Sequence, residues 1–158
     1  MKLDPIFTIN NNTLYKIDDN SQVDASTLKQ LEIKWSTVEL AEEAYNEEYL
    51  AQLRDELKAM DDAGTFAVLV PVVDKPLENA EQVEAFINTF NHTARRVKDC
   101  VSVAGFILPD QIAAKGFEAG SPAADFMETL AIKHAQYVYF VSKNAASLGN
   151  LPDNIATI

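Results

Sequence analysis

The hydrophobic residues of this chain follow two different patterns. A wholly apolar run at 66–73 is typical of a buried strand, and so are the runs of mostly small, β-branched or aromatic residues at 101–108 and 137–142. Between these runs, apolar side chains recur every three or four residues, which predicts amphipathic helices. Strands that alternate with helices in this way favour a parallel sheet with right-handed crossover connections.

The N-terminal part of the chain instead alternates between apolar and polar residues. Residues 6–23 are expected to form a β-hairpin that turns at Asn10-Asn11-Asn12. Residues 31–35 also alternate, and we expect them to form the first strand of the main sheet. A short helical turn is expected within residues 36–45.

Three predicted helices have recognisable ends. The first is expected to start after Asn46, which can cap the free amides, and to stop at Gly64. The second is expected to open with a capping box formed by Asn79 and Gln82. The third is expected to begin at Ser121, which is followed by a proline suited to the first helical turn.

Pro71 complicates the strand that contains it. Because proline donates no backbone hydrogen bond, we expect this strand to be irregular, or to lie at an edge near its exit. The tail at 143–158 shows no clear period. The predicted order is thus a hairpin, three strand–helix units and a closing fourth strand.

Four parallel strands correspond to half of a (β/α)8 barrel. The expected fold class is therefore α/β, a parallel-sheet half of a TIM-like barrel with an N-terminal β-hairpin. We expect a single domain over 1–158, with the hairpin at 6–23 and the βα units at 31–142.

Charge and composition narrow the partners. The chain has 24 acidic and 13 basic side chains, a net charge of −11, so phosphate backbones would be repelled and no nucleic-acid partner is expected. No apolar run is long enough for a membrane span, and Met1–Pro5 lacks the apolar core of a signal peptide. We therefore expect no membrane partner and, by default, a cytoplasmic location.

The acidic residues concentrate between Glu39 and Asp62, which indicates either a solvated helix face or a site for a cation or partner. The single cysteine, Cys100, excludes an internal disulfide. No phosphate loop, nucleophile elbow or metal-ligand spacing occurs, so neither a cofactor nor a metal is expected.

Candidate chemistry lies where the predicted strands end. In parallel α/β folds the carboxyl ends of the strands and the following loops form the ligand-binding crevice. The polar residues at these ends are therefore the expected ligand-binding residues: Lys34, Trp35, Asp74, Asp110, Gln111 and Ser142. Asp110 either acts as an acid or simply caps the backbone after Pro109.

Several segments resemble glycoside hydrolase family 5, the cellulase-like barrels. These are the tyrosine–asparagine start and leucine-striped helix at 45–64 with the strand after it, the helix ending in Ala-x-Arg-x-Lys-Asp at 94–99, and Val103-Ala104-Gly105-Phe106. The early hairpin is also similar to one that plugs the barrel floor in this family. The resemblance covers about 6–142 and corresponds to the first half of the barrel.

The same resemblance implies degenerate catalytic positions. The acid/base glutamate corresponds to Gln111, whose amide has no titratable proton, and the strand that resembles the histidine-bearing one ends at Asp74 without a histidine. Lys34 corresponds loosely to a basic residue of the family. The family's nucleophile lies on a late strand beyond this sequence, and retaining hydrolysis needs two carboxylates about 5–5.5 Å apart.

Three functional readings remain open. The first is a glycoside-hydrolase-like domain without catalysis that binds a carbohydrate or a protein, in which Trp35 either stacks on a sugar ring or belongs to the core. The second is an active glycoside hydrolase on β-linked polysaccharide, using Asp110, Asp74 or a carboxylate from another chain. The third is a structural or assembly protein.

The half-barrel also predicts a problem of exposed surface. Four parallel strands have two open edges, and strands that are apolar on both faces need a cover on each side. A homodimer would provide this cover, and the alternative is a monomer whose tail after Lys143 folds over the open face.

Overall fold

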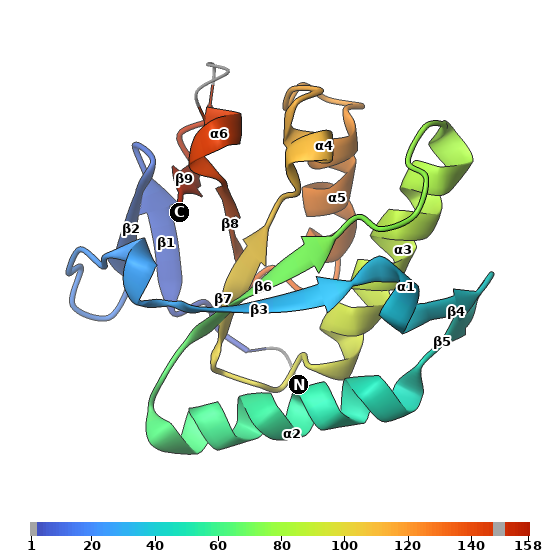
Figure 1. Ribbon diagram of the computed structural model, residues 1–158. Coiled ribbons are helices and arrows are strands. Elements are labelled where there is room, and N and C mark those ends of the chain that lie inside the picture. The colour runs from blue at the N-terminus through green and yellow to red at the C-terminus, as the bar shows by residue number, and fades with distance from the viewer. Residues whose placement is uncertain (1–2, 147–150) are drawn as a thin grey trace.

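The computed structural model describes residues 3–146 and 151–158 and has a five-stranded parallel sheet at its centre (Figure 1). The strand order is β3-β6-β7-β8-β9. These strands are β3 (Lys29–Lys34), β6 (Ala67–Val72), β7 (Val103–Ile107), β8 (Val138–Val141) and β9 (Ile155–Thr157). The expected half of a TIM-like barrel with an N-terminal hairpin is confirmed.

Three longer helices pack on one face of the sheet (Figure 1). They are α2 (Glu47–Ala63), α3 (Ala80–Arg96) and α5 (Pro122–Ala131). Short helical segments join the other elements: η1 (Ala25–Thr27), α1 (Trp35–Val38), α4 (Asp110–Ala113) and α6 (Lys143–Ala146). Among the described residues, no helix is both long and apolar enough to cross a bilayer.

The helix ends follow the sequence pattern. The Asn46 side chain accepts a hydrogen bond from the Tyr49 amide, and Gly64 ends α2 with φ of 70°. Asn79 and Gln82 form the expected capping box of α3. Because these signals involve neighbours in sequence, local chemistry alone fixes where the helices begin and end.

An antiparallel hairpin, β1 (Phe7–Asn10) with β2 (Thr13–Lys16), covers the other face of the sheet. The hairpin and the inward-facing sheet residues form a second apolar core separate from the one under the helices: Phe7, Ile9, Leu14, Leu28, Val68, Ala104, Ile107, Val138, Phe140 and Ala156. The Asn12 side chain donates hydrogen bonds to the carbonyls of Pro152 (2.6 Å) and Ile155 (2.7 Å). The hairpin, rather than the tail, therefore covers this face.

Three local expectations need correction. The tail carries α6 and a fifth strand, β9, because Tyr139–Val141 of β8 offer a paired edge to Ile155–Thr157. The segment after α1 holds a small hairpin, β4 (Glu39–Ala41) with β5 (Ala44–Tyr45), which a helical turn alone did not predict.

The third correction concerns Pro71, because β6 lies inside the sheet between β3 and β7. The Ala67 amide donates to the Ser102 carbonyl, on the side of β7. Because backbone groups alternate sides along a strand, the nitrogen of Pro71, four residues later, also points to the β7 side. Pairing with β7 ends at Leu69, and no ladder bond is lost at Pro71. The expected irregularity occurs at the strand entry instead, where the register shifts between Ala67 and Val68.

Candidate functional site

The polar residues predicted at the strand ends follow β3, β6, β7 and β8, which run parallel and end at one edge of the sheet. We call this the carboxyl edge. The structure groups its polar side chains into two serine–aspartate pairs, Ser36 with Asp74 and Ser142 with Asp110. Sequence reasoning found both aspartates and Ser142 but missed Ser36, because a serine one residue past a tryptophan has no distinctive pattern.

Asp74 is held by the start of α1. The Ser36 amide donates to Oδ1 of Asp74 at 2.9 Å, and the Ser36 hydroxyl donates to Oδ2. Burial acts to raise the pKa of Asp74, but the two Ser36 hydrogen bonds and the charge of Lys34 together lower that pKa below its ordinary value. Asp74 is therefore ionised at neutral pH, and it can accept hydrogen bonds but cannot serve as a proton donor there.

Asp110 lies in the first turn of α4 and is exposed. The Ser142 hydroxyl donates to its Oδ1 at 2.6 Å, while the Ser142 oxygen also accepts from the Ala145 amide at 3.1 Å. Asp110 thus ties the end of β7 to the end of β8 and leaves its second oxygen without a partner among the described residues. Gln111 and Lys34 are exposed on the same edge.

Trp35 lies in the core, so the expectation that it could contact a ligand is wrong. Its side chain is 2 % exposed and packs edge-to-face on Phe86 at 5.3 Å. Its indole N–H donates to Glu39 Oε1 at 3.0 Å, and Lys75 Nζ lies 5.3 Å from the ring centroid. Trp35 and Val38 are the buried residues of the short helix α1 and share its inward side, as the alternative core interpretation of Trp35 had it.

Glu39 and Lys75 were not anticipated by the sequence analysis. Lys75 Nζ lies 2.9 Å from Glu39 Oε1, and it also donates to the Glu39 carbonyl at 3.0 Å. The glutamate is 8 % exposed, so the ion pair supplies the partner that a buried carboxylate requires. The four-residue spacing of Trp35 and Glu39 was the one available signal, whereas Lys75 is distant in sequence.

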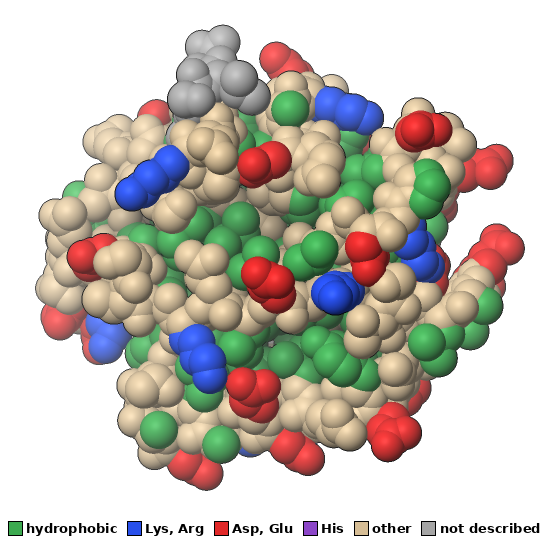
Figure 2. Space-filling model, viewed as in Figure 1, with side chains coloured by type: hydrophobic (Ala, Val, Ile, Leu, Met, Phe, Trp, Pro, Cys, Tyr) green, Lys and Arg blue, Asp and Glu red, His purple; other side chains and the backbone are tan. Residues whose placement is uncertain are grey.

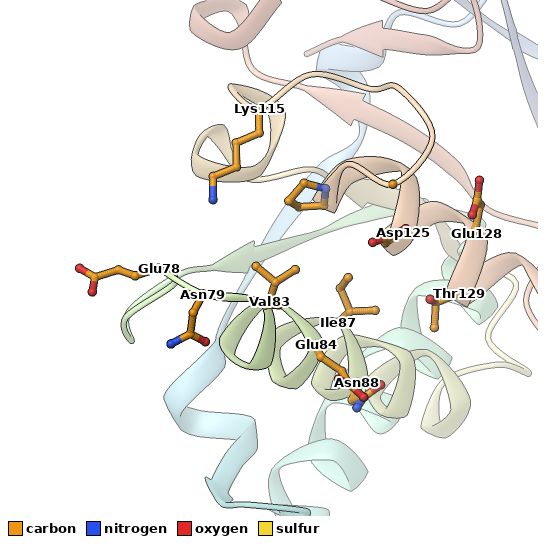
Figure 3. A pocket seen from close by; sticks show the side chains of 13 residues that line it. Glu78, Asn79, Val83, Glu84, Ile87, Asn88, Lys115, Asp125, Glu128 and Thr129 are labelled. Carbon is orange, nitrogen blue, oxygen red and sulfur yellow. The ribbon is translucent and has the colours of Figure 1, made fainter.

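A hollow of about 700 Å³ lies between α3 and α5 on the helical side (Figure 3). Glu84 and Asn88 of α3 and Asp125, Glu128 and Thr129 of α5 line its walls. Its upper rim reaches the loops that follow β6 and β7, but none of the expected ligand-binding residues lines it. The hollow and the carboxyl edge are therefore separate features.

The carboxyl edge offers hydroxyl and carboxylate oxygens, the amide of Gln111 and the ammonium group of Lys34. Such groups suit hydrogen bonding to a polar ligand. Glycoside hydrolysis asks for more, namely a protonated acid and a second carboxylate across the scissile bond. Cys100 supplies no alternative nucleophile, because burial and then the Asp99 charge raise its thiol pKa to about 11.

Comparison with solved structures finds the same fold in glycoside hydrolases. Endo-glycoceramidase II from Rhodococcus sp., as its lactosyl-enzyme intermediate, aligns over 82 % of this chain and 48 % of its own, with 16 % identity and a TM-score of 0.57. The same enzyme in a cellobiose-like imidazole complex aligns over 72 % and 40 %, at 17 % identity and a TM-score of 0.55. A GH5_18 structure from Bifidobacterium longum subsp. infantis aligns over 79 % and 36 %, at 13 % identity and a TM-score of 0.54.

These likenesses confirm the resemblance to the first half of a family 5 barrel at the level of the fold. The chain spans less than half the length of each of these structures. No family model matches the sequence, and no curated protein matches it either.

Proposed function

We propose that this chain is a glycoside-hydrolase-like domain that binds a carbohydrate at its carboxyl edge without hydrolysing it. The observation that carries the proposal is the side-chain chemistry of that edge. The position that corresponds to the acid/base glutamate holds Gln111, and the serine–aspartate pairs engage both Asp74 and Asp110. An amide cannot protonate a leaving oxygen, and an ionised carboxylate such as Asp74 cannot do so either.

Carbohydrate is the ligand class that fits these groups best. Sugar hydroxyls donate to carboxylates and accept from amides and ammonium groups, which are the groups that Asp110, Gln111 and Lys34 present. The similar endo-glycoceramidase II structures are a lactosyl-enzyme intermediate and a cellobiose-like imidazole complex. The fold likeness and the polar edge together support a sugar site, with a protein ligand at this edge as the competing reading.

The binding test uses cellobiose and lactose titrated into isotope-labelled protein and followed by NMR. We expect amide shifts confined to the segments around Ser36, Asp74, Asp110 and Ser142. Asp110→Asn should weaken binding, because a carboxylate that accepts from sugar hydroxyls becomes an amide, whereas Asp55→Asn on exposed α2 is the matched control. Shifts confined to the amino ends of the strands would refute the site.

The catalytic test measures release of nitrophenol from aryl β-glucoside and β-lactoside. We expect no turnover by the wild type, and none by Gln111→Glu, since a restored acid would still lack a nucleophile. Turnover by the wild type that Asp110→Asn abolishes would establish the active hydrolase instead, with Asp110 as its acid.

A further inference from the structure

Two adjoining hollows lie between the C-terminal ends of α3 and α5, at the opposite end of the sheet from the carboxyl edge. Their volumes are about 380 and 460 Å³, and both are lined by Arg95, Ile132, Lys133 and His134. Lys98 also lines the second space, together with Leu3 and Gln136. We call the four shared residues, Lys98 and the space between them the basic hollow.

The charge of the basic hollow is opposite to that of the whole chain. Arg95, Lys98 and Lys133 are exposed and form no ion pair with any residue in 3–146 or 151–158, and no described acidic residue lines either space. The chain nevertheless carries a net charge of −11. Three unpaired cations that converge in an acidic protein leave a local positive field.

The helix dipole accounts for part of this arrangement only. Cations are favoured at helix C-termini, where α3 and α5 end. Arg96 satisfies that preference and is also bound by Glu47, with Nη2–Oε2 at 2.8 Å. Arg95, one residue earlier, has no such partner within the described part of the chain and lines both spaces. The dipole explains why cations occur here, but not why these three lack carboxylates.

An apolar side chain stands among the cations. Ile132 is 73 % exposed, more than any other large hydrophobic residue that the structure describes. It lines both spaces beside Lys133. A free isoleucine next to unpaired cations calls for an occupant that has both negative charge and an aliphatic group.

The neighbouring surface limits the length of that occupant. Asn88 and Thr129 line both the basic hollow's first space and the large hollow of Figure 3, so the groove between α3 and α5 continues upward. There it meets the acidic side chains of Glu84, Asp125 and Glu128. A long polyanion such as nucleic acid would be repelled at that point, and a flat lipid surface cannot enter a concave space.

We propose that the basic hollow docks a short acidic segment of a partner polypeptide, whose carboxylates pair with Arg95, Lys98 and Lys133 and whose aliphatic side chain covers Ile132. The contact is electrostatic in its specificity and apolar at its centre. It is independent of the sugar site at the carboxyl edge. The chain thus has two binding surfaces at opposite ends of its sheet.

The test uses a fluorescein-labelled peptide of alternating glutamate and leucine, with fluorescence anisotropy as the readout. Wild type is expected to bind it, and added salt should weaken binding. R95A/K98A/K133A should lower affinity about ten-fold or more, since three exposed charge pairs are lost. The control K29A/K115A/K143A has the same net charge as the first triple variant and should bind like the wild type.

Two further arms separate the alternatives. Ile132→Ser should weaken peptide binding, and the same peptide with glutamine for glutamate should not bind. The proposal is overturned if wild type fails to bind the acidic peptide, or if the two triple variants bind it equally. Binding to phosphatidylserine-containing vesicles but not to the peptide would likewise overturn it and assign the surface to lipid.

Discussion

Gly105 is the residue on which the close approach of β7 and β8 depends. A Cβ at this position would lie 1.7 Å from the Val138 carbonyl oxygen and 2.7 Å from its carbon. Gly105 and Val138 are also paired in register. Because both contacts involve backbone atoms, no change of rotamer can relieve the overlap, and the two strands would have to separate.

We therefore expect Gly105→Ala to lower the free energy of unfolding by about 2–4 kcal/mol. Urea denaturation measures this as a lower midpoint. The control is Gly64→Ala, where φ is 70° but nothing lies within 4 Å of the added carbon, so a loss of only about 1 kcal/mol is expected. Equal losses for the two variants would contradict the overlap explanation.

Glu47 makes the stability of the fold dependent on acid pH. It accepts from Arg96 and lies 3.0 Å from His92 Nε2, and the Arg96 hydrogen bond, opposed by desolvation and aided by His92, lowers its pKa from 4.5 to about 2. A carboxylate with a depressed folded-state pKa stabilises the fold above its unfolded pKa. That contribution is lost as the pH falls from about 4.5 towards 2.

Glu47→Gln should therefore be less stable than wild type at pH 7 and equal to it near pH 2. The difference at pH 7 should be no more than about 1 kcal/mol, because the side chain is half exposed. Thermal melts across this pH range measure it, with Glu48→Gln as the control. A gap that persists unchanged at the lowest pH would show that Glu47 acts through packing rather than charge.

At the scale of elements, local signals were predictive and pairing signals were not. The caps at Asn46 and Asn79 and the stop at Gly64 act within a few residues, so the sequence states them directly. Strand β9 has three residues and no period of its own. Its conformation is stabilised by hydrogen bonds to β8, which depend on the tertiary arrangement.

The contact between the first hairpin and β9 offers a test of such pairing. Asn12→Gly keeps the left-handed conformation, φ 61°, but removes the side chain that binds the Pro152 and Ile155 carbonyls. We expect a loss of about 1–2 kcal/mol in chemical denaturation. Asn11→Gly is the matched control, since Asn11 has φ 51° and its side chain forms no hydrogen bond with the residues that the structure describes, and it should cause little change. Equal effects would mean that turn entropy dominates.

At the scale of the whole molecule, the helices cover one face of the sheet and the hairpin covers the other. The edge strand β3 carries exposed Lys29, Glu32 and Lys34, which oppose pairing with another strand. Figure 2 shows charged side chains of both signs scattered over the side of the molecule that faces the viewer. The covered face removes the main reason to expect a dimer, although self-association itself stays a prediction.

The hairpin's role as cover is open to a direct test. Leu14 of β2 is 2 % exposed and belongs to the second apolar core. Leu14→Asp should therefore undock the hairpin and uncover apolar side chains of β7 and β8. We expect increased dye binding and a larger mass in light scattering. Thr8→Asp, on the outer side of β1, should match the wild type. If the wild type is itself a dimer in light scattering, the pairing of two half-barrels is supported instead.

The candidate site was predictable in place but not in detail. Parallel topology alone brings Asp74, Asp110 and Ser142 to one edge, and the strand ends in the sequence identify them. The inward orientation of the Trp35 side chain is stabilised by Phe86, Glu39 and Lys75, which only the tertiary structure places beside it. No local pattern announces such contacts.

The hydrogen bonds of Asn12 to residues 140 and 143 positions later also set an order of events during synthesis. At ribosomal rates of about 5–20 residues per second, roughly 7–30 s separate the appearance of the hairpin from that of its anchor. Until the Pro152 and Ile155 carbonyls are available, the hairpin lacks this anchor, and the apolar face beneath it is less firmly covered. Stable docking of the hairpin should therefore occur only after residues 152–155 have been synthesised.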